Sequence, residues 1–322
     1  MNRRKFLKNS LLATASIATP DLLTDVKMTK PRLLAGEFGA DRRMLKLKGE
    51  YYRHYPVDFS KGKTGATGFH GWGNSVELEA PMAETALIPM HIWNIGFHPE
   101  LSFSPAGKAG PVMEMLEWAS RSVPIIQQEI PPILKAARDA QLTVIHVASD
   151  EPYAKKYPGY RRALEIAGDE PPGLPTAPAS SDGKSPDEGK ANLLFGSQFT
   201  DALAHYSPHI DFPELARPLA DEFVVFTTHQ LNEVLRTKGI WNLIYIGFAL
   251  NWCLWFSPCG MVDMSRLGYR CSCIKEAVTA VENKESAVGE LNKQEALWRT
   301  SLMFGYIHSA RDFIRACKAM EE

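Results

Sequence analysis

Residues 241–261, WNLIYIGFALNWCLWFSPCGM, decide the fold of this chain. Their apolar run 243–246 is bounded by Gly247, which is typical of a short strand buried on both faces of a sheet. Helical character begins near Asn251, so the stretch predicts a strand, a turn and a helix. Cys253 falls in the first turn of that helix, where the helix dipole lowers a thiol pKa and favours a nucleophilic thiolate. The alternative is that Cys253 is a small buried apolar side chain, as many free cysteines are.

Further apolar runs alternate with amphipathic segments on both sides of this unit. Strands are predicted at 85–90, 142–147, 223–226 and 270–275, and helices at 112–140, 228–238 and 295–320. Strands that alternate with helices predict right-handed crossovers and a parallel sheet covered on both faces. The pattern therefore indicates an α/β fold.

The composition is that of a globular protein. The chain has 322 residues, a net charge of −1, 45% hydrophobic and 23% charged residues, which suit one large or two small domains. A near-neutral charge without a basic stripe argues against nucleic acid as the main partner. The five cysteines are an odd number, and their spacing matches no zinc site.

Residues 1–18 have the layout of an export signal. Arg3 and Arg4 precede a short apolar stretch, 10–18, that ends in small residues. The paired arginines resemble the twin-arginine signal of bacterial proteins that cross the membrane folded, so we expect a periplasmic or otherwise exported protein. The apolar stretch is too short to span a bilayer, so no stable membrane anchor is predicted. A basic N-terminus of a cytosolic protein is the alternative.

The rest of the chain divides into an arm and a main domain. Residues 19–80 are rich in aromatic residues and glycine, which predicts an irregular N-terminal arm. Residues 81–322 carry the regular pattern of strands and helices. The Pro-, Gly- and Ser-rich segment 167–190 is expected to be a solvated insertion or flap in this domain.

The ordered motifs of residues 85–283 resemble the isochorismatase-like cysteine hydrolases. Residues 86–94, ALIPMHIWN, lie in register with the family's first strand, A-L-[LIV]-x-[IVL]-D-x-Q-N. Residues 247–253, GFALNWC, fit its G-x-x-x-N-x-C nucleophile segment. The resemblance implies a three-layer α/β/α fold of Rossmann type, with a parallel sheet of about six strands.

Two of the family's three catalytic positions differ in this sequence. His91 stands where the family has an Asp that takes the thiol proton, and Thr227, with His229 beside it, stands near the family's Lys. A protonated imidazole beside a thiol also stabilises a thiolate, so a Cys253–His91 pair is a sensible nucleophile and base. His229 or Thr227 would then cover the missing Lys.

The resemblance implies a hydrolase that acts on a C–N bond of amide type in a small-molecule substrate. Aromatic walls near such a site favour a flat or apolar ligand. The expected substrate-binding residues are Trp93, Asn94, Asn251, Trp252 and Trp72. The alternative is a catalytically degenerate, exported ligand-binding protein on the same fold. A homo-oligomer is compatible with either function.

A metal site is the remaining alternative for the cofactor. Some relatives, the nicotinamidases, bind zinc through an Asp and His residues after the second strand. Here His146 and Asp150 are candidates, and His91 and His229 could join them, but the Asp-x-His spacing is absent. We therefore expect no cofactor, with zinc as the alternative.

Overall fold

The computed structural model describes residues 43–62, 64–102, 116–172, 193–194, 196 and 204–320. The chain divides into two units, Met1–Ala40 and Asp41–Glu322, and everything below concerns the second unit. The expected signal segment, 1–18, and most of the expected insertion, 167–190, lie outside the described residues. No helix of the described part is long and apolar enough to cross a membrane.

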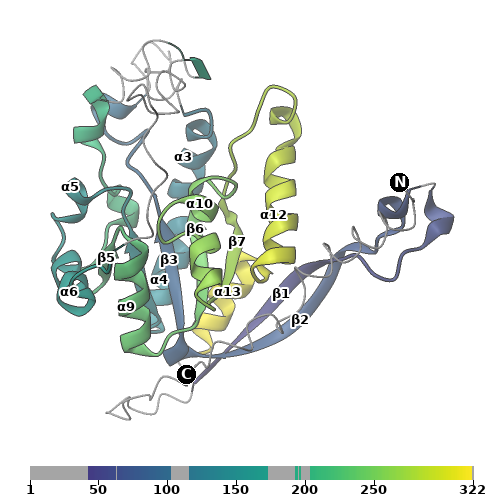
Figure 1. Ribbon diagram of the computed structural model, residues 1–322, viewed down its shortest axis with the longest axis horizontal. Helices are drawn as coiled ribbons and strands as arrows, with labels where there is room; N and C mark the ends of the chain where they lie inside the picture. Colours follow the sequence, from purple (N-terminus) through teal and green to yellow (C-terminus); the bar gives the residue numbers. More distant parts are fainter. Residues whose placement is uncertain are drawn as a thin grey trace. The chain divides into compact units, whose positions relative to one another are not determined.

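One sheet forms the centre of the unit (Figure 1). Its described strands number eight and lie in the order β2-β1-β8-β7-β6-β3-β4-β5. They are β1 (Met44–Arg53), β2 (Gly71–Pro81), β3 (Thr85–Met90), β4 (Thr143–Val147), β5 (Phe223–Val225), β6 (Asn242–Gly247), β7 (Arg270–Val278) and β8 (Ile307–His308). The six strands from β3 to β8 are parallel to one another, which confirms the predicted parallel sheet.

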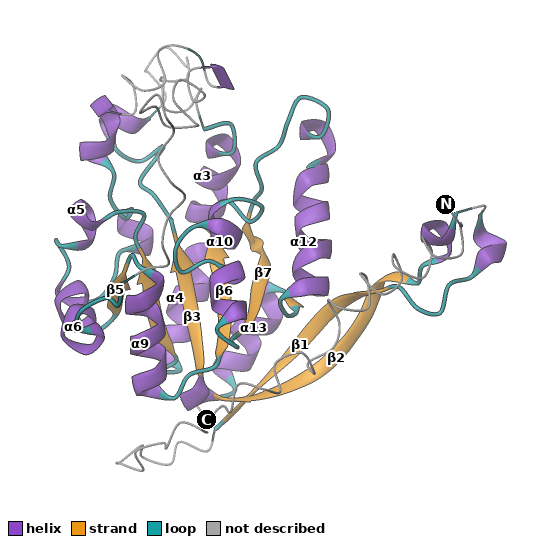
Figure 2. Ribbon diagram, in the orientation of Figure 1, coloured by secondary structure: helices purple, strands orange, loops and turns teal. Residues whose placement is uncertain are grey.

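Helices cover both faces of the parallel strands, so the predicted three-layer fold is confirmed (Figure 2). One face packs against α3 (Ala119–Gln128), α4 (Ile130–Asp139) and α13 (Ala310–Lys318). The other packs against α6 (Pro158–Ala167), α9 (Thr228–Lys238), α10 (Cys253–Phe256), α11 (Met261–Arg266) and α12 (Leu291–Met303). Short α5 (Glu151–Ala154) follows β4. Alternate residues of β6 enter the two cores, Leu243 one and Ile244 the other, which is why the strand is apolar throughout.

Two predicted helices are each divided in the structure. The segment 112–140 forms α3 and α4, and α4 has Pro131 and Pro132 directly after its first residue, Ile130, which suits the first turn of a new helix. The segment 295–320 forms α12, the two-residue β8 and α13. Gly305 lies before β8, where a Cβ would stand 2.5 Å from the Cys271 carbonyl oxygen. The backbone must therefore approach β7 closely at this point, and a continuous helix is excluded.

The expected irregular arm is corrected over residues 44–81. Strands β1 and β2 form a long antiparallel hairpin, and β1 joins the sheet where Glu50 lies opposite Ile307 of β8. Leu45 and Leu47 are buried, whereas Lys46 between them is exposed. This alternation of apolar and polar residues is the signature of a strand with one buried face.

The order of the parallel strands reverses between β3 and β6. From this pair the chain winds outward through β4 and β5 on one side and β7 and β8 on the other. In such sheets ligands bind outside the carboxyl ends of the strands at the point of reversal. Met90 ends β3 opposite Gly247, which ends β6, so the segments containing His91 and Cys253 both leave the sheet at this edge.

Candidate active site

The loop between β6 and α10 is fixed by its glycine and its asparagine. A Cβ on Gly247, which has φ of 122°, would stand 1.9 Å from the Met90 carbonyl oxygen, so only glycine fits beside β3. The Asn251 side chain donates to the Val281 carbonyl and accepts from the Val281 N–H, at 3.0 and 2.8 Å. Asn251 was expected to bind substrate, but the structure places its amide in this bond between two loops. Two residues of the G-x-x-x-N-x-C segment thus hold the loop, and Cys253 follows them.

Cys253 is the first residue of α10 and is half-buried, whereas the other four cysteines are buried. Burial raises the pKa of its thiol, although a hydrogen bond with the Ser257 side chain and one with the backbone of Ala249 oppose the rise. Burial therefore outweighs the lowering of the thiol pKa that was expected from the helix dipole. The resting state is therefore a thiol, which corrects the prediction of a thiolate.

His91 is buried directly after β3, with its backbone in the left-handed region at φ of 51°. Burial lowers the pKa of its imidazole to about 4, although a hydrogen bond with the backbone of Ala148 opposes the change. The imidazole is therefore neutral at pH 7, which corrects the prediction of an imidazolium beside Cys253. Nδ1 has no hydrogen-bond partner. If the Ala148 carbonyl accepts from the other ring nitrogen, Nδ1 carries a free lone pair.

A row of aromatic rings connects His91 with the Cys253 loop. His91 stacks on Trp93 with ring centroids 5.9 Å apart, Trp93 lies 5.6 Å from Trp118, and Trp118 stacks on Phe248 at 5.7 Å. Trp93 is only partly exposed and packs against three apolar clusters, so its ring supports the site from within. This differs from the substrate-binding role expected for it.

Asn94 positions a neighbouring loop. Its amide donates to the His209 carbonyl at 3.0 Å and accepts from the Asp211 N–H at 3.0 Å. Both hydrogen-bonding ends of the side chain are therefore engaged within the protein. The structure assigns Asn94 to the loop, whereas the sequence predicted contact with substrate.

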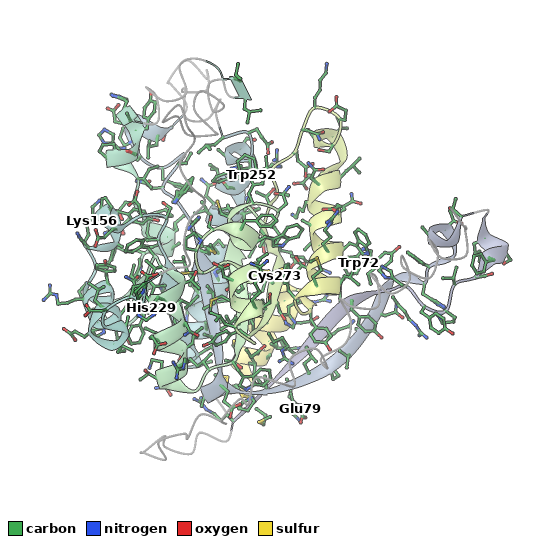
Figure 3. All side chains as sticks on the ribbon, viewed as in Figure 1. Trp72, Glu79, Lys156, His229, Trp252 and Cys273 are labelled. Carbon is green, nitrogen blue, oxygen red and sulfur yellow. The ribbon has the colours of Figure 1, made fainter. Side chains whose placement is uncertain are left out.

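Thr227 and His229 also have partners within the protein. Thr227 is the N-cap of α9, where its hydroxyl accepts from the Gln230 N–H at 3.2 Å in a capping box. His229 Nε2 lies 3.0 Å from the Ala167 carbonyl oxygen at the end of α6. Figure 3 shows His229 well away from Trp252, which precedes Cys253. The structure therefore does not bring His229 to the position of the family's Lys.

The two exposed tryptophans that were expected to bind substrate lie in different places. Trp252 is 45% exposed at the start of α10. Trp72 lies on the hairpin, edge-on to Tyr52 with ring centroids 5.6 Å apart. The two tryptophans are well separated in Figure 3. Trp252 thus stays a candidate for substrate contact, and Trp72 is part of an aromatic cluster on the hairpin.

The candidate zinc ligands are not brought together. His146 is buried, and its Nε2 lies 2.9 Å from Glu222 Oε2; Glu222 also accepts from Arg138 Nε at 2.7 Å. Asp150 caps α5 by accepting from the Tyr153 N–H. In the described part of the chain no group of three or more His, Cys, Asp or Glu side chains could hold a metal ion.

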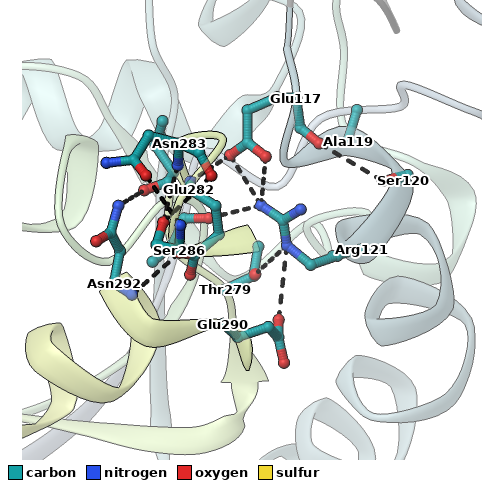
Figure 4. A network of polar contacts seen from close by, with 12 residues as sticks. Glu117, Ala119, Ser120, Arg121, Thr279, Glu282, Asn283, Ser286, Glu290 and Asn292 are labelled. Carbon is teal, nitrogen blue, oxygen red and sulfur yellow. Dashed lines mark hydrogen bonds and ion pairs between the residues drawn. The ribbon is translucent and has the colours of Figure 1, made fainter. Parts of the chain in front are cut away.

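Arg121 of α3, which was not predicted from the sequence, lies in a network of polar contacts with the segment that follows β7 (Figure 4). Its guanidinium donates to both Glu117 carboxylate oxygens, to the Ala280 carbonyl at 2.9 Å and to the Thr279 hydroxyl at 3.2 Å. The Thr279 carbonyl in turn accepts from the Leu250 N–H at 2.8 Å. In the sequence, Glu117 and Arg121 look like an ordinary i,i+4 helix pair, so no signal marked them out.

The comparison with solved structures finds distant similarities to known proteins. No family model matches the sequence, and no curated protein matches it. Among solved structures, the chain is similar to a cysteine hydrolase from Pseudomonas syringae pv. phaseolicola, with 15% identity, 75% of this chain and 95% of that chain covered, and a TM-score of 0.43. It is also similar to an isochorismatase from Pseudomonas putida KT2440, with 15% identity, coverage of 72% and 91%, and a TM-score of 0.39. An N-carbamoylsarcosine amidase from Thermoplasma acidophilum has 16% identity, coverage of 70% and 96%, and a TM-score of 0.33.

Proposed function

We propose that this protein is an exported hydrolase that cleaves a C–N bond of amide type, with Cys253 as the nucleophile and His91 as the base. One observation carries the proposal: of the five cysteines, only Cys253 is not buried, and it follows the strand that adjoins the His91 strand at the reversal of the sheet. Ligands of doubly wound folds bind at this position.

The neutral states of the Cys253 thiol and the His91 imidazole support a concerted proton transfer between them. With a raised thiol pKa and an imidazole pKa of about 4, the neutral pair is favoured over thiolate and imidazolium. The thiol proton therefore passes to His91 Nδ1, directly or through a water molecule, as the sulfur attacks the amide carbon. The C–N bond then breaks, the imidazolium returns the proton to the leaving amine, and water hydrolyses the thioester. No step requires a cofactor.

Release of ammonia from a panel of primary amides and N-carbamoyl compounds tests the proposal. For any substrate found, Cys253→Ala should abolish turnover, and His91→Asn should lower kcat by about 10²-fold or more, because the general base is lost. His54→Asn is the matched control, since His54 lies on the hairpin and accepts from the Trp298 indole N–H. Unchanged turnover in the Cys253→Ala protein would disprove the nucleophile.

A second candidate is a binding protein that retains the fold without catalysis. It is favoured by the use of Thr227 as a helix cap at the position of the family's Lys. Such a protein would bind amide-like compounds equally well as wild type and as Cys253→Ala, with no ammonia released by either. The same panel, measured by calorimetry, separates the two functions.

A further inference from the structure

A groove of about 600 Å³ lies at the opposite edge of the sheet from Cys253. Arg270, the first residue of β7, and Trp241, which precedes β6, mark this edge as the amino ends of the parallel strands. The groove is lined by residues from the hairpin, the start of β7, the end of α12 and the segment before β8, among them Tyr51, Val76, Arg270, Leu302, Met303 and Tyr306. Its volume falls within the usual range for small-molecule sites, roughly 300–1,000 Å³.

Arg270 supplies a cation to this groove. Its guanidinium lies 4.7 Å from the centre of the Trp241 ring and 5.9 Å from that of Tyr306, and its Nε donates to Asn242 Oδ1 at 2.8 Å. Among the described residues no carboxylate pairs with it, and Glu84 on this side accepts from the Trp241 indole instead. The Trp241 and Tyr306 rings and the Asn242 side-chain amide thus hold the guanidinium in place. The side-chain hydrogen bond described for Arg270 uses only Nε. A fixed guanidinium of this kind matches a carboxylate through two parallel hydrogen bonds.

Apolar side chains line the same groove as the Arg270 guanidinium and are exposed to solvent. Leu302 and Met303, in the last turn of α12, are 53% and 56% exposed, and Val76 of β2 is 38% exposed. A contiguous set of exposed apolar side chains beside a cation indicates a ligand with a charged end and an apolar body.

We propose that this groove binds a small carboxylate with an apolar body. The carboxylate accepts from the terminal guanidinium nitrogens of Arg270, and the body lies against Val76, Leu302 and Met303. The site is separate from Cys253, and the proposal does not depend on the hydrolase function.

Calorimetric titration of the full chain with benzoate, and with benzyl alcohol as the neutral analogue that has no amide bond, tests the proposal. We expect saturable benzoate binding and at least tenfold weaker binding of benzyl alcohol, because the neutral hydroxyl cannot form a charge-assisted pair. Arg270→Gln should weaken benzoate binding about tenfold or more. Arg299→Gln, the matched control, should leave binding unchanged, since Arg299 stacks on Trp298 and pairs with Glu295 outside the groove.

Two further variants keep the test decisive. Met303→Glu changes an exposed position, so the protein should fold, and the added carboxylate should weaken benzoate binding by repulsion. Cys253→Ala should bind benzoate as wild type does. The proposal is overturned if wild type does not bind benzoate, if benzyl alcohol binds equally well, or if Met303→Glu and a folded Arg270→Gln protein bind with unchanged affinity.

Discussion

Replacing His91 with Asn should change how the stability of the protein depends on pH. Burial lowers the pKa of His91 from 6.5 to about 4, so the unfolded chain takes up the proton more readily than the folded protein. The contribution of the neutral imidazole to the free energy of unfolding is complete above pH 6.5 and is lost as the pH falls toward 4. From the two pKa values, the free energy of unfolding should fall by about 2 kcal/mol between pH 7 and pH 5, and by about 3 kcal/mol between pH 7 and pH 4.

Asparagine suits this test because it does not titrate and because it tolerates the left-handed φ of 51° at this position. Urea unfolding at pH 7 and pH 5 gives the free energy of unfolding of both proteins. The advantage of wild type over His91→Asn should shrink by about 2 kcal/mol at the lower pH. An advantage that is the same at both pH values would refute the assignment of a buried, neutral imidazole.

His308 provides an independent control for the same measurement. It is buried in β8, its Nδ1 lies 2.9 Å from the Lys48 carbonyl oxygen, and burial lowers its pKa to about 4. His308→Asn should therefore show a pH-dependent change of similar size. His91 follows β3 and His308 lies in β8, two strands that do not adjoin, so the changes should add in the double variant.

Three further predictions concern residues with assigned partners. Burial alone would raise the pKa of Glu222, but its bonds with His146 and Arg138 lower that pKa to about 2. Glu222→Ala should therefore lower the free energy of unfolding, measured in urea at pH 7, by about 3 kcal/mol. A decrease of less than about 1 kcal/mol would contradict the buried network. Thr227→Ala removes the N-cap of α9 and should lower the free energy of unfolding by about 1 kcal/mol in the same assay. An unchanged midpoint of urea unfolding would contradict this prediction. Changing Arg3 and Arg4 to Lys should block export, whereas export of the variant, or an intact Met1 on native protein, would contradict the twin-arginine signal.

The fold was predictable where burial is continuous along the sequence. Apolar runs such as 243–246 and 142–147 mark strands covered on both faces, and glycine at 247 marks the close approach to β3. The hairpin was missed because the glycine-rich stretch within 62–73 obscured the alternation around Leu45 and Leu47. Strand β8 was missed because two residues are too few to show any period.

The candidate site was predictable in position but not in charge. Which residues follow β3 and β6 can be read from the motif, whereas the thiol and imidazole pKa values depend on burial, to which residues distant in sequence contribute. The role of Thr227 could have been found in the sequence, because Thr227 and Gln230 form the T-x-x-Q pattern of a capping box. The bonds of Asn94 to the 209–211 loop join residues more than a hundred positions apart and leave no local pattern.

Alkylation of native protein by iodoacetamide, followed by peptide mapping over time, tests the nucleophile most directly. Because burial raises the thiol pKa, Cys253 should react more slowly than free cysteine at pH 8, but well before Cys259, Cys271, Cys273 and Cys317, which are buried. The five should react alike in urea, which is the control, and an amide substrate should protect Cys253. Labelling of Cys253 at the same rate as the four buried thiols would contradict its assignment as the catalytic nucleophile.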